Sequence, residues 1–214
     1  MYGEEDAGTR SRLADSTGFP YDDNTAGIAL PVPDCGDWIQ TFSGRKVRPL
    51  SPDPETLCIE DIAHALANQC RFTGHVREFY SIAQHCVLVS LYCPPEDAFT
   101  GLMHDSAEAY LCDIARPVKY DPRFSFYKVA EKAMEQAIAV RFNLPPEPDS
   151  VKKTDRRLLY TERRDLLHPL AMANRSWGPE PDTQPLEFTI VPWLPKEAEQ
   201  RFLSRFKELT DVRN

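Results

Sequence analysis

A succession of helical apolar patterns, three of them ended by proline, constrains this chain more than any other feature of its sequence. Apolar side chains recur at spacings of three and four residues, the period of a helix that buries one face. Proline lacks the backbone N–H that a helix interior needs, so proline pairs and runs mark the helix ends. No stretch shows the alternation of a series of strands, and the sequence therefore predicts an all-α protein. The helices are predicted at residues 58–70, 79–93, 96–114, 125–142 and 150–167, with a last one that contains Ala198, Phe202, Phe206 and Leu209.

The chain divides into three stretches that differ in composition. Residues 1–36 mix acidic, small and turn-forming residues with little periodicity, which predicts an irregular N-terminal arm. Residues 37–170 hold the main helical patterns, and a length of 214 residues suits one domain of this kind. Residues 171–214 combine a proline-rich segment with the last helix, which is expected to pack on that domain as a C-terminal extension.

Composition and charge exclude several classes of protein. With 25 basic and 33 acidic residues the net charge is −8, so most of the surface would repel duplex nucleic acid. No run approaches the roughly 18 apolar residues of a membrane span, and the N-terminal residues do not resemble a secretory leader. These absences predict a cytoplasmic protein without a membrane partner. The six cysteines form no C-x-x-C pair, which excludes a zinc ribbon and a thioredoxin-type redox site.

Three chemically active side chains share the predicted 96–114 helix. His104 and Glu108 are four residues apart and so lie on one face, and Asp105 follows His104 directly. The His-Asp pair offers a nitrogen and a carboxylate oxygen to a divalent cation, and Glu108 is close enough to act on a water bound there. A histidine beside an acid is also a common hydrogen-bonded pair, so this helix alone does not define a site.

Two further residues of the ligand type are predicted to face the core. His85 lies in a segment that is apolar nearly all round, and Asp155 lies on the apolar stripe of the predicted 150–167 helix. A lone carboxylate is costly to bury, and a cation bound between the helices would relieve that cost. The structural alternatives are a hydrogen-bonded core histidine and an aspartate paired with Arg71 or Lys119.

The order of these four residues resembles the H...HD...D pattern of the HD-domain phosphohydrolase superfamily, over roughly residues 57–168. The resemblance implies an HD-domain helical bundle in which His85, His104, Asp105 and Asp155 hold a catalytic divalent metal. Such a ligand set accepts Mn, Co, Fe, Ni, Zn or Mg.

The segment MHDSAEAYLCDIARPVK at 103–119 is similar to bacterial and phage HD-domain 5′-deoxynucleotidases and their deoxynucleoside triphosphohydrolase relatives. The resemblance implies that Glu108, Asp113 and Lys119 serve catalysis and that Arg71 and Phe72 hold the nucleotide. Phosphate charge must also be offset, for which Arg71, Lys119 and Arg116 are the candidates.

The expected function is that of a divalent-metal-dependent phosphohydrolase acting on a small-molecule nucleotide. Few basic residues surround the predicted site, which favours a deoxynucleoside 5′-monophosphate over the more highly charged triphosphate. The alternatives are a deoxynucleoside triphosphate triphosphohydrolase, a hydrolase of signalling or cyclic nucleotides, and a catalytically inactive nucleotide-binding HD protein. The acidic balance disfavours a helical DNA-binding protein. A homo-oligomer is an expectation that rests on the resemblance alone.

Overall fold

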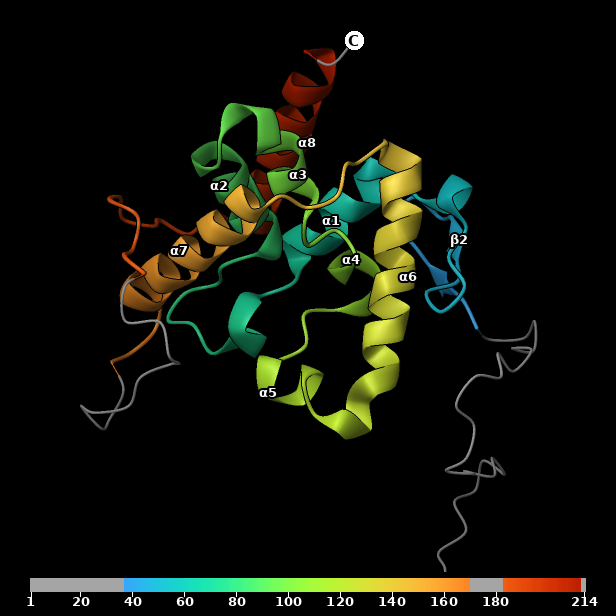
Figure 1. Cartoon of the computed structure of the whole chain (residues 1–214), viewed down its shortest axis with the longest axis horizontal. Coiled ribbons are helices and arrows are strands. Elements are labelled where there is room, and N and C mark those ends of the chain that lie inside the picture. The colour runs from blue at the N-terminus through green and yellow to red at the C-terminus, as the bar shows by residue number, and fades with distance from the viewer. Residues whose placement is uncertain (1–36, 170–182, 213–214) are drawn as a thin grey trace, which may run out of the picture. The chain divides into compact units, whose positions relative to one another are not determined.

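The computed structural model describes residues 37–169 and 183–212, and the arm predicted at residues 1–36 lies outside this part. The described residues belong to one compact unit that spans Asp34–Asn214. Its architecture confirms the all-α prediction (Figure 1). The helices are α1 (Ile59–Asn68), α2 (Ile82–Tyr92), α3 (Ala98–Met103), α4 (Glu108–Leu111), α5 (Arg116–Lys119), α6 (Ser125–Phe142), α7 (Asp149–Leu166) and α8 (Pro195–Asp211).

Short elements join these helices. A short hairpin, which the sequence pattern did not predict, pairs two strands of two residues each, β1 (Ile39–Gln40) and β2 (Lys46–Val47), in antiparallel register. The described part of the predicted proline-rich segment, residues 183–194, contains neither helix nor strand. The described ranges also contain four 3-10 turns: η1 (Pro54–Thr56), η2 (Arg71–Gly74), η3 (Pro95–Asp97) and η4 (Pro122–Phe124).

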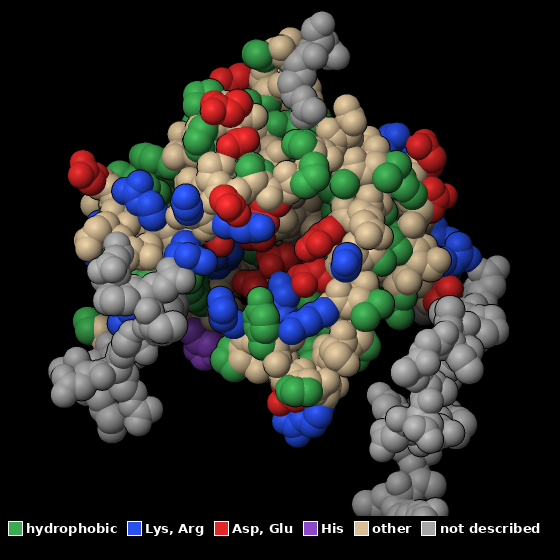
Figure 2. All heavy atoms as spheres, viewed as in Figure 1, with side chains coloured by type: hydrophobic (Ala, Val, Ile, Leu, Met, Phe, Trp, Pro, Cys, Tyr) green, Lys and Arg blue, Asp and Glu red, His purple; other side chains and the backbone are tan. Residues whose placement is uncertain are grey.

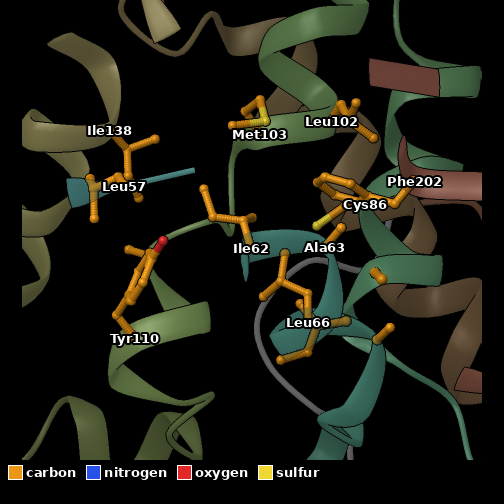
Figure 3. Close-up of a cluster of buried hydrophobic side chains, with 14 of the residues drawn as sticks. Leu57, Ile62, Ala63, Leu66, Cys86, Leu102, Met103, Tyr110, Ile138 and Phe202 are labelled. Atoms are coloured by element: carbon orange, nitrogen blue, oxygen red, sulfur yellow. The ribbon is translucent and has the colours of Figure 1, made fainter. Parts of the chain in front are cut away.

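The main core is enclosed by α1, α2, α3 and α8, with α6 packed alongside (Figure 3). Leu66, Leu102 and Phe202 come from three different helices and are fully buried there. Burial of such side chains contributes about 1.5 to 3 kcal/mol each to stability. The last helix, α8, therefore supplies part of the core that positions α2 and α3. No helix in the described ranges has the length and apolar character needed to cross a membrane.

The limits of α6 match the prediction, but one residue of its buried face differs. Asn143 ends the helix in the left-handed conformation, with φ of 51°. Phe126 falls on the same apolar stripe as Ala130, Met134 and Ala137 in the sequence, but it is 59% exposed. Tyr127 is buried in its place, and its hydroxyl donates to the Cys112 carbonyl at 2.6 Å. A tyrosine whose hydroxyl finds an acceptor can be buried at little cost.

The predicted continuous helix at 96–114 is interrupted. Helix α3 ends at Met103, α4 begins at Glu108, and a tight turn connects them. In a continuous helix the Gly101 carbonyl would accept from the Asp105 N–H. Here the His104 ring takes that carbonyl at 2.9 Å, and the Asp105 backbone hydrogen-bonds the Cys86 thiol. Side-chain hydrogen bonds have thus replaced the helical ones.

Candidate metal centre

The four predicted ligands meet at one point although they come from separate elements. His85 lies on α2, His104 and Asp105 follow α3, and Asp155 lies on α7. Nε2 of His85 is 3.3 Å from Nε2 of His104 and 3.2 Å from Oδ1 of Asp155. Oδ2 of Asp105 is 3.2 Å from Nε2 of His104 and 3.5 Å from Nε2 of His85. Two nitrogens and two carboxylate oxygens therefore face one another.

The four measured separations are of the size found between neighbouring ligands of a metal ion. A metal with ligand bonds of about 2.1 Å separates neighbouring ligand atoms by about 3.0 Å in octahedral and about 3.4 Å in tetrahedral geometry. The observed contacts span 3.2 to 3.5 Å. A mixed nitrogen and oxygen donor set is suited to Mn, Fe, Co, Ni or Zn.

The other nitrogen of each imidazole ring has its own acceptor. Nδ1 of His85 is 2.6 Å from Oε1 of Glu162, and Nδ1 of His104 is 2.9 Å from the Gly101 carbonyl oxygen. A carbonyl oxygen can only accept, so Nδ1 of His104 carries the proton. In the neutral rings both Nε2 lone pairs then point at each other, and only positive charge between them removes the repulsion. His85, His104, Asp105 and Asp155 would hold a divalent cation here, which would supply that positive charge.

The carboxylates around this buried centre favour positive charge there. His85 is fully buried, the His104 side chain is 6% exposed and that of Asp155 is 41% exposed, so solvent reaches the centre from one side. Burial by itself lowers the pKa of His104, but the Asp105 and Asp155 carboxylates raise that pKa to about 10 overall. Burial likewise acts to raise the pKa of Asp105, yet His104, His85 and Arg71 lower it.

Arg71, the predicted nucleotide-binding residue, lies directly against the centre. Its Nη1 is 3.5 Å from Oδ2 of Asp105, and its Nη2 is 3.3 Å from Oε2 of Glu162. The sequence left open that Asp155 pairs with Arg71 or Lys119. The structure instead pairs Asp155 with His85, whereas Arg71 contacts Asp105 and Glu162.

Glu108 begins α4 beside the centre and is buried, with 8% of its surface exposed. Its Oε2 atom has no hydrogen-bond partner among the described residues. Burial raises its pKa to about 9, and the charges of Asp105 and Asp113 add to the shift. A cation at the neighbouring ligands would counter this shift, because positive charge favours the carboxylate.

The remaining predicted site residues differ in how closely the structure ties them to this centre. Lys119 is partly buried, and its Nζ is 2.5 Å from Oε1 of Glu131. Burial opposes its charge, but Glu131, Glu108 and Asp105 together raise its pKa, so it lies within electrostatic reach of the centre. Phe72 has a φ of 55° and packs against the Arg71 guanidinium. Arg116 is exposed, and its guanidinium lies 5.0 Å from the centre of the Tyr120 ring.

The sequence reasoning missed two residues of this neighbourhood. Glu162 is fully buried and contacts both His85 and Arg71. It follows Asp155 by seven residues on α7, two helical turns, and that spacing is the signal that could have revealed it. Cys86 lies in the apolar pattern of α2, and its sulfur is within 4.8 Å of ligand atoms of His104 and Asp105. Burial raises the pKa of this thiol far above its usual range.

A hollow marks this face of the molecule. Figure 2 shows Asp and Glu side chains at the floor of the hollow and Lys and Arg side chains around its rim. In the same view the hollow lies between the positions of α7 and α6 in Figure 1. An acidic floor suits a cation, and a basic rim suits an anion that binds to it.

The fold and the site define an all-α protein with a candidate centre of two histidines and two aspartates. Comparison with known proteins adds the family. The chain is 38% identical over 179 residues to the uncharacterized protein YfdR of Escherichia coli K12, which covers 82% of this chain and 97% of that protein. It therefore belongs to the same family as YfdR. It is also 32% identical over 117 residues to the uncharacterized protein RCAP_rcc00048 of Rhodobacter capsulatus, covering 50% of this chain and 59% of that protein. No family model matches the chain.

Proposed function

We propose that this chain is a divalent-metal-dependent phosphohydrolase of nucleotides, with 5′-deoxynucleotidase activity. One observation carries the proposal. The Nε2 atoms of His85 and His104 lie 3.3 Å apart, carboxylate oxygens of Asp105 and Asp155 lie 3.2 to 3.5 Å from one or both of them, and a guanidinium group lies against the Asp105 carboxylate. The first feature fits a metal cation, and the second fits an anionic ligand of that cation. The resemblance of the H...HD...D order to HD-domain phosphohydrolases supports the same function.

The residues of the chain divide the work of such a reaction among them. His85, His104, Asp105 and Asp155 would hold the cation, which supplies positive charge for a phosphoryl oxygen and lowers the pKa of water. Arg71 binds and orients the phosphate through its guanidinium group.

Two more residues act at the edge of the centre. Glu108 accepts a hydrogen bond from the attacking water and takes its proton, because its buried Oε2 is otherwise without a partner among the described residues. Lys119 offsets the negative charge that develops on the phosphoryl group.

The surroundings of the centre favour a monophosphate. Arg71 is the cation in direct contact with a ligand of the centre, and Lys119 is already paired with Glu131. A triphosphate carries about three to four negative charges and needs more counter-charge than this pair offers. Phe72 flanks Arg71 and can form an apolar wall for the base or sugar.

The test is product analysis with two substrates. The protein is incubated with dAMP and with dATP in Mn²⁺ or Co²⁺, and the products are separated. Phosphate and deoxynucleoside from dAMP support the proposal. Triphosphate released from dATP with dAMP untouched replaces it by the second candidate, a deoxynucleoside triphosphate triphosphohydrolase, which the basic rim of the hollow favours.

A matched pair of variants shows whether any activity belongs to this centre. His104→Ala removes a ligand, whereas His64→Ala removes a histidine of α1 that stacks on Phe42 and contacts Glu199. Activity should be lost in the first variant and kept in the second. Binding of both nucleotides without hydrolysis would identify a nucleotide-binding protein instead of an enzyme.

A further inference from the structure

Glu162 is a fully buried carboxylate in the C-terminal half of an otherwise amphipathic helix. It lies on α7 between the buried Leu158 and Leu166, with none of its surface exposed. A charge in such a position is costly unless it is paired and hydrogen-bonded. Apolar side chains of similar volume commonly replace buried ion pairs without loss of stability. The fold alone therefore does not explain a carboxylate at this position.

Glu162 contacts residues of the metal centre, and it also interacts with the buried core residue Tyr80. Its Oε1 accepts from Nδ1 of His85 at 2.6 Å, and its Oε2 accepts from Nη2 of Arg71 at 3.3 Å. Arg71 reaches on to Oδ2 of Asp105 through its other terminal nitrogen, at 3.5 Å. His85, Glu162, Arg71 and Asp105 thus form a chain of contacts that begins and ends at a ligand of the candidate centre.

The two contacts of Glu162 fix the tautomer of His85 and the orientation of Arg71. An imidazole ring can carry its proton on either nitrogen, and the hydrogen bond to one nitrogen decides which atom is left for a metal. A buried guanidinium on a long side chain needs a fixed acceptor to keep its orientation. Glu162 supplies both acceptors, one from each carboxylate oxygen.

We propose that Glu162 is a positioning residue shared by the metal centre and the anion-binding guanidinium: it keeps the proton of His85 on Nδ1, so that Nε2 faces the cation, and it holds Arg71 beside Asp105. The inference rests on the metal centre of the proposed function but not on the reaction or the substrate. Glu162 itself does not contact the cation or the phosphate.

The first test compares metal binding in two variants that each neutralise a buried carboxylate. Glu162→Gln keeps the shape of the side chain but removes its charge and places an amide against Arg71. Asp61→Asn does the same to a carboxylate of α1 that is 2% exposed and accepts from Ser43 and Cys58. Zn²⁺ affinity is measured by competition with a chelating dye, with folding followed by circular dichroism.

The expected result is a difference between the two variants. Zn²⁺ affinity should fall by about 10- to 100-fold in Glu162→Gln, the usual effect of removing the partner of a metal-binding histidine. In Asp61→Asn it should stay within about twofold of the wild type. Unchanged affinity in a folded Glu162→Gln protein overturns the proposal. So does an equal loss in both variants, because that would indicate general loosening of the structure.

The second test uses the wild-type chain and therefore does not depend on the folding of any variant. In zinc-loaded protein with ¹⁵N-labelled histidine, NMR distinguishes the two ring tautomers of His85. A proton on Nδ1 supports the inference, and a proton on Nε2 overturns it. If the wild-type chain binds no divalent metal at all, the proposed function fails with it. If the wild type binds metal but the Glu162 results are negative, only this inference fails.

Discussion

At the scale of single residues, two histidines decide what this centre can hold. Nδ1 of each ring donates to an acceptor, so the Nε2 atoms of His85 and His104, 3.3 Å apart, have only lone pairs to offer when the rings are neutral. In the neutral state, neither Nε2 atom has a hydrogen-bond donor among the described residues to accept from, as a purely structural histidine would. The pair is stable where positive charge lies between the rings.

His104→Ala should abolish metal binding because it removes a ligand atom and not merely the partner of one. We expect the affinity to fall by more than the roughly 100-fold that loss of an outer partner costs. The measurement is elemental analysis after dialysis against a metal-buffered solution, with His64→Ala as the control. Metal retained at the wild-type level in His104→Ala would show that the cation, if any, binds elsewhere.

Glu108→Gln should separate catalysis from metal binding. Its Oε2 is buried without a partner among the described residues, and the ligand positions are filled by other side chains. Turnover of dAMP should therefore fall by about 10² to 10⁴, the usual contribution of a general base, while bound metal remains. Glu55→Gln, at a side chain that is 81% exposed, is the control. Loss of the metal itself would make Glu108 a ligand.

At the scale of elements, the contact between α2 and α3 is set by a glycine. A methyl group at Gly101 would lie 2.9 Å from Sγ of Cys93 and 3.3 Å from Cα of Ser90. Because Gly101 has no side chain, α2 and α3 approach more closely than a larger residue at this position would allow. This close approach brings His85 and His104 together.

Gly101→Ala should push these helices apart and lower the free energy of unfolding by about 1 to 3 kcal/mol, as overpacking does. Urea denaturation measures the change. The double variant with Cys93→Ala removes the nearest obstructing atom and should recover part of the loss. Equal stability of Gly101→Ala and the wild type would mean that the helices can separate freely.

The elements also show how far the sequence could predict this structure. The apolar spacing of residues 125–142 predicted α6 with its limits, because proline and periodicity are local signals. The break after Met103 was missed, since it depends on the His104 ring and the Cys86 thiol taking hydrogen bonds from the helix backbone. Such competition depends on α2, a partner distant in sequence. The contact between Arg71 and Glu162 could not be predicted for the same reason, because the two residues are far apart in the sequence.

At the scale of the molecule, the candidate centre takes its ligands from three elements. Helices α2 and α3 share the main core, and α2 also packs against α7 in a second apolar cluster that contains Val89, Val151 and Leu158. A ligand that binds the folded chain and not the unfolded chain stabilises the fold in proportion to its affinity and concentration. A cation held by all three elements should therefore raise the stability of the whole described unit.

Divalent metal should raise the melting temperature of the wild-type chain. At about 100 times the dissociation constant the gain is about 2.7 kcal/mol, which for a chain of this size corresponds to about 5 to 10 °C. Thermal unfolding with Mn²⁺ or Zn²⁺, and again after addition of a chelator, measures the shift. His104→Ala should show no shift. An equal shift in that variant would assign the stabilisation to another binding site.

The turn between α3 and α4 has a further consequence, which concerns the entropy of the chain. In a regular helix two consecutive side chains diverge by about 100°, which turns them away from a shared ion. Here His104 and Asp105 converge to 3.2 Å. The other ligands lie 19 residues before this pair (104 − 85) and 50 residues after it (155 − 105). Closing such loops costs entropy that grows with their length, whereas the adjacent pair closes almost none. Bringing His104 and Asp105 together therefore costs the least loop-closure entropy of any pair of ligands in the centre.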